Sequence, residues 1–536
     1  MKLINELKNE LRDFRKNFIS DFIAGFLVFL LALPLSIGIA QASDFQPIYG
    51  LITAAIGGCI VAFFSGSPLS IKGPAAGLIV LVASSVADFG GGQIGWKLTL
   101  GVIIASGFLQ VIFGLIRFGS LTEIFPFSVV KGMLAAIGLI ILSKQLHSVL
   151  GFNPLDDHNK PIIEPIELFL ELPKAIQNMN FKAFLVGLVA LVILFTWPLI
   201  IPQKLKRVPG PVMMLLVIIP FSFLIGLNDL KDEKGLPLYY INFNQGLFDV
   251  LTINVNFDGF KQGILFIKHT LIFAIIGSLE SMLTVNAIDL MVNKKDKSQP
   301  NRDLIAIGVG NIASGFVGGL PIISEVARST ANISYGAKTR WSNFFHGVIM
   351  LMFLVYAVKF SSLIPKPALA AILISVGVRL ANPSQLMLVL KIGKEQLLAF
   401  VVTIIFTLTF DLLVGILIGT ISKILILFIN GLTFKSLFKS YVQITRVNNL
   451  YTITIEESAH FLNFIKIKKE MSAIEIKNNV IIDIGKAKLI DSTVMQNLKN
   501  FSEIYIKSGG ECTIIGTDNH VAFSNHIYSS LKQKKK

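Results

Sequence analysis

The 536-residue chain has few charged residues and almost no cysteine. Asp, Glu, Lys and Arg together make up 15% of the sequence, whereas 53% is hydrophobic and the mean hydropathy is +0.69. A soluble domain of ordinary composition carries about 25% charged residues, so we expect most of this chain to lie in lipid. Of the two cysteines, Cys59 falls in an apolar run and Cys512 in a polar tail. We therefore expect no disulfide framework.

The sequence also lacks the motifs of an enzyme. The polar tail that begins near Tyr441 contains no nucleotide-binding glycine fingerprint and no cluster of metal ligands. We therefore expect no enzyme activity, no cofactor and no resident metal. The net charge of +15 would suit nucleic acid, but basic loops on one side of a membrane explain it more simply, and we expect no nucleic-acid partner.

Long apolar runs dominate what is present. A transmembrane helix needs about 20 apolar residues, and after an N-terminal segment, 1–21, such runs follow one another as far as residue 432. We predict a polytopic α-helical membrane protein with fourteen spans, near 22–41, 48–64, 74–87, 98–116, 126–146, 181–201, 208–226, 263–290, 304–320, 324–337, 341–360, 364–379, 396–410 and 411–432.

Charges between the runs indicate which side of the membrane each loop faces, because short cytoplasmic loops are rich in Lys and Arg. The longer loops 150–180 and 227–262 balance their few lysines with Asp156, Asp157, Glu164, Glu167, Asp232 and Glu233. With the N-terminus inside, the inner loops receive Arg117, Lys204, Lys206, Arg207, Lys294, Lys295, Lys297, Arg302, Lys338, Arg340, Arg379, Lys391 and Lys394. We expect a multi-pass protein of the inner (plasma) membrane with both termini cytoplasmic.

Two runs are too short to cross a bilayer. One begins at Pro74 after SGSPLSIKG and the other at Ser324 after GFVGGLPII, and each continues for about 14 residues. At about 1.5 Å per residue this is near 21 Å, against a hydrocarbon core of roughly 30 Å. We therefore predict half-crossing helices as segments 3 and 10.

These short runs occupy matching places. Pro74 lies about 52 residues after the start of the first run at Phe22, and Ile323 about 52 residues after Leu271 in the eighth. Interrupted segments at corresponding places are typical of an inverted-repeat transporter. We predict a 7+7 inverted repeat, with repeats at about 22–226 and 263–432. The alternative is that Gly and Pro only allow close helix packing.

The starts of the two half-helices are the predicted ligand site. The first N–H groups of a helix that begins inside lipid need a partner, and the helix dipole adds about half a positive charge there. An anion meets both requirements. The predicted contacts are Ala75, Ala76, Gly77, Ser324, Glu325, Val326 and Arg328.

Two cationic side chains accompany the breaks. Arg328 lies one turn into the tenth run, where a guanidinium needs water, a counter-charge or a substrate. It either raises the positive potential of the site or pairs with Glu325, three residues earlier on the same face. Lys72 directly precedes the first break, and it either raises the anion potential or is an ordinary cytoplasmic-loop lysine.

Glu280 lies in the middle of the eighth run, with Thr284 on the same helical face. A carboxylate that is buried and isolated prefers to be protonated. We expect Glu280 to bind a proton or, with Thr284, to hold Na⁺. The alternative is a structural pairing with Lys131, Lys144 or Arg328.

The tail at 441–532 reads as a small soluble α/β domain. Strand-like runs VQITRVNNLYTITIEE and NNVIIDIG alternate with helix-like FLNFIKIKKEM and MQNLKNFSEIYIKSG. Ser492 or Thr493 can cap the second helix. We expect a packing and interaction domain, with a cytoplasmic protein as a candidate partner.

Several motifs, in order, resemble the SulP family of inorganic anion transporters, whose members carry a C-terminal STAS domain. The likeness covers nearly the whole chain and rests on ALPLSIGIA, GSPLSIKGPAAG, GSLESMLT, GNIASGFVGGLP, ARSTANISYGAKTR and IIDIGKAKLIDST. It implies fourteen spans in a core and a gate, a site between the third and tenth half-helices, and a homodimer. It also implies that Glu280 is the coupling acid, with Thr284 beside it.

Three motifs depart from the family pattern. Ser-Gly-Pro-Thr is replaced by Lys72-Gly73-Pro74-Ala75, and Ser-Phe-Ser-Arg by Glu325-Val326-Ala327-Arg328. In the tail, the Gly that usually follows the Asp-Ser-Ser/Thr turn is Val494. The second change places an acid beside the expected anion.

The sequence therefore favours a secondary-active transporter of a small oxyanion, of the sulfate or bicarbonate class, coupled to H⁺ or Na⁺. One alternative is a nucleobase-type permease with the same inverted repeat. The other is a membrane sensor that does not transport and that signals anion binding through its tail.

Overall fold

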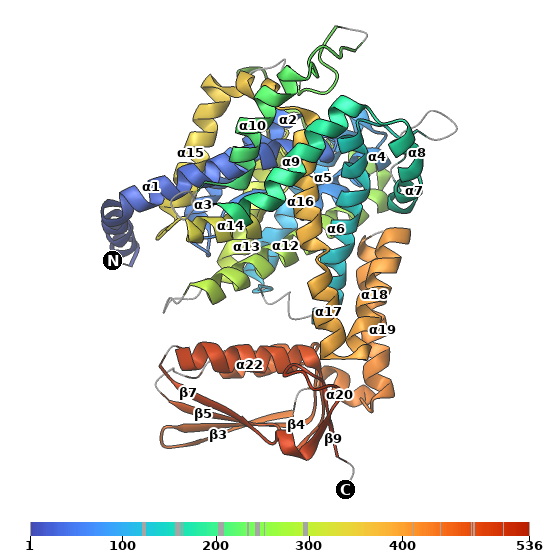
Figure 1. Cartoon of the computed structure of the whole chain (residues 1–536). Coiled ribbons are helices and arrows are strands. Elements are labelled where there is room, and N and C mark those ends of the chain that lie inside the picture. Colours follow the sequence, from blue (N-terminus) through green and yellow to red (C-terminus); the bar gives the residue numbers. More distant parts are fainter. Residues whose placement is uncertain are drawn as a thin grey trace. The chain divides into compact units, whose positions relative to one another are not determined.

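Helices form most of the described chain as far as residue 438, and a sheet domain follows (Figure 1). The computed structural model describes residues 2–119, 125–155, 162, 164–201, 208–232, 235–241, 247–250, 252–292, 298–410, 412–439, 441–472, 474, 478–507 and 509–534. The loop charges predicted at 202–207, 293–297, Asp156, Asp157 and Glu233 lie outside these residues.

The described chain divides into two compact units. The first comprises the described residues of 1–119, 137–292 and 298–379, and the second those of 120–136 and 380–536. Helix α6, Phe127–Leu150, belongs to both.

Helices and two very short strands build the first unit. Proline at the first helical position begins α2 and α13, and the Asn180 side chain accepts a hydrogen bond from the backbone N–H of Ala183 to cap α9. The elements are α1 Lys2–Ala42, α2 Pro47–Ile56, a π-helical turn Gly57–Val61, α3 Ala62–Phe64, β1 Lys72–Pro74, α4 Ile79–Asp88, α5 Gly92–Leu115, α7 Pro165–Leu170, α8 Leu172–Gln177, α9 Phe181–Ile200, α10 Gly210–Leu224, α11 Leu247–Val250, α12 Ile264–Met291, α13 Pro300–Phe316, β2 Ile322–Ser324, α14 Val326–Ser334, α15 Trp341–Tyr356 and α16 Lys366–Leu380.

Each of the fourteen apolar runs contains a helix. Within the described residues, eight helices are long and apolar enough to cross a membrane by length and composition. The helix in the third run is short and spans Ala76–Asp88 with its preceding 3₁₀ turn, and α14 in the tenth run has only 9 residues. The expectation of a helical membrane protein is confirmed.

Glycine allows the backbones of α5 and α13 to approach closely. A Cβ at Gly107 would lie 2.7 Å from the Gly308 carbonyl oxygen, and one at Gly308 would lie 2.6 Å from that of Gly107. Contact between helix backbones at small residues is a common way to pack helices in lipid. This packing holds α13 beside α5 and so positions the chain that leads into β2.

The second unit combines helices with the sheet domain. Its helices are α17 Pro383–Ile392, α18 Lys394–Thr409, α19 Leu412–Ile429, α20 Phe434–Phe438, α21 Phe464–Ser472 and α22 Ser492–Lys507. Its strands are β3 Tyr441–Val447, β4 Leu450–Ala459, β5 Asn479–Asp483, β6 Ala487–Ile490, β7 Glu511–Ile515, β8 His520–Ala522 and β9 Leu531–Gln533.

The seven strands form one mixed sheet in the order β7-β5-β4-β6-β9-β8, with β3 antiparallel to β4. Strands β4, β5, β6 and β7 pair in parallel, and helices α21 and α22 connect them along the chain. A core that includes Ile482, Phe464 and Leu498 lies between sheet and helices. The expected small α/β tail is therefore present.

Candidate functional site

Strands β1 and β2 bring the two predicted breaks together. They pair antiparallel, with Lys72 opposite Ser324 and Pro74 opposite Ile322. Because the strands run in opposite directions, the helix that follows each one starts at the opposite end of the same ladder, roughly 10 Å away. The first turns of the 76–88 helix and of α14 therefore lie near each other, one at each end of this short ladder.

Lys72 joins the two breaks through a buried ion pair. Its side chain and that of Asp303 are both fully buried, and the Lys72 Nζ lies 2.9 Å from Asp303 Oδ1. The same Nζ donates to Ser324 Oγ at 2.7 Å, and Ser324 Oγ donates to Asp303 Oδ2 at 3.0 Å. Lys72 is therefore not an exposed loop lysine, and a carboxylate balances its charge.

Sequence reasoning missed Asp303. This residue lies in the first turn of α13, immediately before the apolar run 304–320. An acid at the end of a loop is common and does not indicate a buried ion pair. Ser65 Oγ also donates to Asp303 Oδ1 at 2.6 Å. The available signal was Lys72, because a lysine in an apolar break requires a counter-charge somewhere in the chain.

Arg328 is fully buried and only partly satisfied. Its Nη2 donates to the Pro74 carbonyl oxygen at 3.4 Å, and its Nε lies 3.9 Å from Glu325 Oε2. Nε and Nη1 have no hydrogen-bond partner within the described residues, and a Cβ at Gly73 would collide with Nη1. A buried guanidinium with unmet donors, lying against β1, is well suited to an oxyanion.

Glu325 occupies the N-terminus of α14. Its Oε2 accepts a hydrogen bond from the Arg328 backbone N–H at 2.7 Å, which makes it the helix cap. The pairing of Glu325 with Arg328 is thus present, but the Arg328 Nε still has no hydrogen bond to any described residue. The adjacent Val326 is the first residue of α14 and is 45% exposed.

The predicted residues of the first break lie beside Glu280. Ala75 and Ala76 are buried, and a Cβ at Gly77 would collide with the Glu280 carboxyl group. Glycine is therefore required where α12 places its acid against this turn. Among the residues that the structure describes, Glu280 forms no ion pair, and its Oε1 has no hydrogen-bond partner.

Helix α12 also contacts the second break. Ser281 Oγ accepts a hydrogen bond from the Ser324 backbone N–H at 3.2 Å. Thr284 is buried one turn beyond Glu280 on the same helix. Helix α12 therefore has its acid against one break and a hydroxyl against the other.

His346 is a second residue that the sequence did not indicate. It lies on α15, is fully buried, and neither ring nitrogen has a hydrogen-bond partner in the described part of the chain. A histidine in an apolar helix is more often a core residue, so no sequence signal distinguished it.

Comparison with known proteins gives consistent matches. The model of the sulfate permease family matches residues 18–403. The chain is 27% identical over 435 residues to the putative sulfate transporter YvdB of Bacillus subtilis, covering 79% of this chain and 74% of that protein. It is 25% identical over 397 residues to the bicarbonate transporter BicA of Picosynechococcus, covering 73% of this chain and 66% of that protein.

Solved structures share the fold. The transmembrane domain of a cyanobacterial BicA aligns with a TM-score of 0.63 at 23% identity, covering 77% of this chain and 98% of that domain. Murine Slc26a9 in its inward-facing state aligns with a TM-score of 0.65 at 15% identity. The alignment covers 92% of this chain and 85% of the murine chain. The second alignment therefore extends beyond the membrane helices.

Proposed function

We propose that this chain, which belongs to the sulfate permease family of membrane anion transporters, carries a small inorganic oxyanion of the sulfate or bicarbonate class. The names of the relatives YvdB and BicA support this substrate class. Members of this family are transporters and not enzymes. The antiparallel pairing of β1 with β2, which brings the starts of the two short helices together, supports this proposal.

Arg328 is the observation on which the proposal depends. A buried guanidinium is costly unless it is paired, and its Nε and Nη1 have no hydrogen-bond partner among the residues that the structure describes. An oxyanion beside Gly73 and the Ala75–Gly77 turn would accept from these groups and from the helix starts. Glu325, Ser324 and the Val326 backbone would border it from α14.

Transport proceeds in this proposal by alternating access. The membrane part comprises fourteen spans in two inverted repeats, with the 76–88 helix and α14 as the half-helices between which the anion binds. Both termini are cytoplasmic, the membrane is the plasma membrane, and two copies form a homodimer. The tail is a STAS domain that offers its surface to a cytoplasmic protein.

Glu280 couples the anion to a cation in this proposal. Its carboxyl group lies against Gly77 without an ion-pair partner in the described chain. A proton on Glu280, or Na⁺ held with Thr284, would remove the negative charge before an anion arrives. Release of the cation would then favour release of the anion.

Counterflow of labelled anion in proteoliposomes tests the transport proposal. Sulfate, bicarbonate and uracil are compared in the wild-type chain and in Arg328→Gln, with Arg446→Gln, an exposed tail residue, as the matched control. We expect counterflow of an oxyanion that falls at least tenfold in Arg328→Gln and is unchanged in the control. Uracil counterflow would indicate the permease, and anion binding without any counterflow would indicate a sensor.

A further inference from the structure

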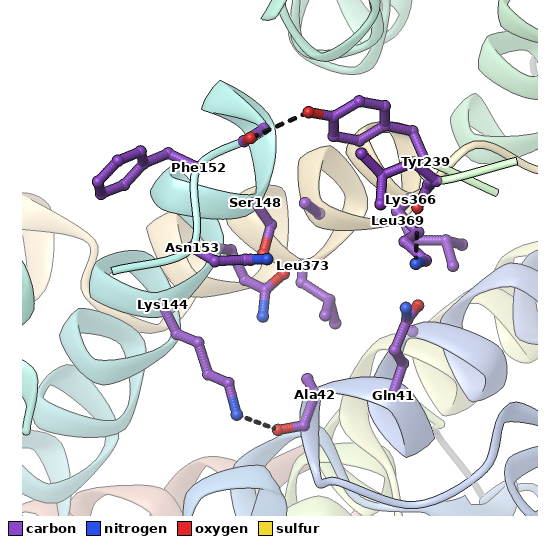
Figure 2. Close-up of a pocket in the computed structure, with 15 residues that line it drawn as sticks. Gln41, Ala42, Lys144, Ser148, Phe152, Asn153, Tyr239, Lys366, Leu369 and Leu373 are labelled. Atoms are coloured by element: carbon purple, nitrogen blue, oxygen red, sulfur yellow. Dashed lines mark hydrogen bonds between the residues drawn. The ribbon is translucent and has the colours of Figure 1, made fainter. Parts of the chain in front are cut away.

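A cavity of about 340 Å³ lies apart from the oxyanion site. Helix α1 forms one wall through Gln41 and Ala42, while α6 and α16 form others through Lys144 and Lys366 (Figure 2). No residue proposed to contact the oxyanion lines it. The cavity is therefore a separate place on the same unit.

Two lysines line this cavity, and Lys366 also interacts electrostatically with Asp232, which does not line it. Lys144 Nζ donates to the Ala42 carbonyl oxygen at 3.0 Å, and Lys366 Nζ donates to the Leu238 carbonyl oxygen at 2.9 Å. Because an ammonium group has three N–H donors, each lysine has further donors to offer. The fifteen lining residues include no carboxylate.

The ion pair of Lys144 with Asp44 is too weak to cancel the lysine's charge. Asp44 Oδ1 lies 3.7 Å from Lys144 Nζ, and the two side chains are 53% and 39% exposed. A pair this exposed is weak and easily screened. The positive charge therefore remains available to a ligand.

The rest of the lining is both polar and apolar. Figure 2 shows the amides of Gln41 and Asn153 at the edge of the hollow, together with Leu369 and Leu373. The volume is several times that of a single oxyanion and falls at the lower end of the range for small-molecule sites. This lining suits a ligand with a negative head and an apolar body.

We propose that this cavity binds a small organic carboxylate, with its head between Lys144 and Lys366 and its body against Leu369 and Leu373. Such a ligand touches α1 on one side and α6 and α16 on the other. The effect on transport rests on the proposed function: if alternating access moves α1 against α6 and α16, the bound carboxylate slows it. Binding itself does not depend on that function.

Calorimetric titration of benzoate tests the site directly, with full-length protein in nanodiscs of neutral lipid. We expect Lys144→Gln and Lys366→Gln each to weaken benzoate binding about tenfold. Lys174→Gln, an exposed lysine that pairs with Glu171 outside the cavity, is the control and keeps wild-type affinity. Gln41→Glu, of nearly equal size, adds a repelling charge and is expected to weaken binding without removing either lysine.

Sulfate distinguishes this site from the oxyanion site. We expect Arg328→Gln to retain benzoate binding, and sulfate not to displace benzoate from the wild type. Loss of benzoate binding in Arg328→Gln, displacement by sulfate, or equal affinity in wild type and both lysine variants would each overturn the proposal. Inhibition of counterflow by benzoate, absent in the lysine variants, tests the effect on transport separately.

Discussion

At the scale of single residues, the oxyanion site places an acid where an anion is expected. Glu325 caps α14 and lies near the Arg328 guanidinium, so in the proposed site its carboxylate would compete with an incoming oxyanion for the same donors. The helix dipole favours any negative group at this position. In the proposed function, the Glu325 cap and the substrate are therefore alternative partners of the start of α14.

Replacing Glu325 by Ser tests this competition. Serine still caps a helix but carries no charge, so we expect the KM for the transported oxyanion to fall severalfold. The measurement is the concentration dependence of counterflow, with Glu325→Asp, which keeps both charge and cap, as the control. A higher KM in Glu325→Ser would mean that Glu325 assists the anion rather than competing with it.

Glu280→Gln separates coupling from transport. Glutamine has almost the same size, but it can neither take up a proton nor hold Na⁺ as a carboxylate does. We expect uptake driven by a pH or Na⁺ gradient to fall at least tenfold, while exchange of anion for anion continues. Gradient-driven uptake at the wild-type rate would remove Glu280 from the coupling proposal.

At the residue scale, the sequence revealed charges that lie in apolar surroundings. Arg328 and Glu280 stand out because a charged side chain inside an apolar run is costly and usually has a functional role. Asp303 did not, since it lies at the edge of a run, and no local pattern records that it reaches Lys72. Long-range partners of this kind depend on the tertiary fold.

At the scale of elements, the ladder of β1 and β2 is the structure that holds the two breaks. Three residues on each strand pair, which is too short a ladder to be stable alone. The Lys72–Asp303 pair adds a link from β1 to α13, and Ser324 joins both charges. We infer that this network, more than the ladder, fixes the geometry of the site.

Breaking that pair should destabilise the protein strongly. Lys72→Met leaves Asp303 buried without a counter-charge, and we expect a loss of about 3–5 kcal/mol of unfolding free energy. The double variant Lys72→Met/Asp303→Leu should recover much of it, because it removes both charges. Thermal denaturation in detergent measures both variants, and a double variant no more stable than Lys72→Met would contradict the argument.

The sequence predicts where the helices lie, but it does not predict that the two short strands before the half-helices pair with each other. Hydropathy located a helix in every apolar run because lipid requires apolar side chains over the length of a span. The shortness of the 76–88 helix and of α14 followed from the Gly and Pro residues before them. The antiparallel pairing of β1 with β2 joins segments about 250 residues apart, which no local period encodes.

At the scale of the whole molecule, α19 and the sheet domain share one core within their unit. Leu427 and Leu432 pack with Phe461 and Leu489. Lys423 and Asp491 are both fully buried, with Nζ 2.8 Å from Oδ1. A lysine in an apolar helix thus obtains its counter-charge from the domain that follows it.

Asp491→Ala should therefore damage the membrane part as well as the tail. We expect a lower yield of folded protein in size-exclusion chromatography, since Lys423 would be buried and unpaired. Adding Lys423→Met should restore the yield. Equal yields of Asp491→Ala and wild type would show that the pair contributes little.

His460 makes the contact between the sheet domain and the α19–α20 segment sensitive to acid. Burial lowers the pKa of His460, and its Nε2 donates to the Ser436 carbonyl oxygen at 3.0 Å, so the neutral ring is the form that fits. The unfolded histidine has a pKa of 6.5, and stability at this junction is therefore complete above that pH and is lost as the pH falls below it.

Hydrogen exchange from pH 7.5 to 5.5 measures this dependence. After correction for intrinsic rates, we expect protection of residues 434–464 to fall severalfold on acidification in the wild type. The fall should be absent in His460→Gln, and His526→Gln, elsewhere in the tail, should behave as the wild type does. Unchanged wild-type protection would contradict the role of His460.

The Lys72–Asp303 pair also imposes an order on biosynthesis. A ribosome adds about 230 further residues after Lys72 before Asp303 is made, which takes roughly 10–50 s at 5–20 residues per second. During that interval the ammonium group has no native counter-ion, so the first break cannot settle in lipid by itself. We therefore expect the first break to take its native place only after the segment that contains Asp303 has been made.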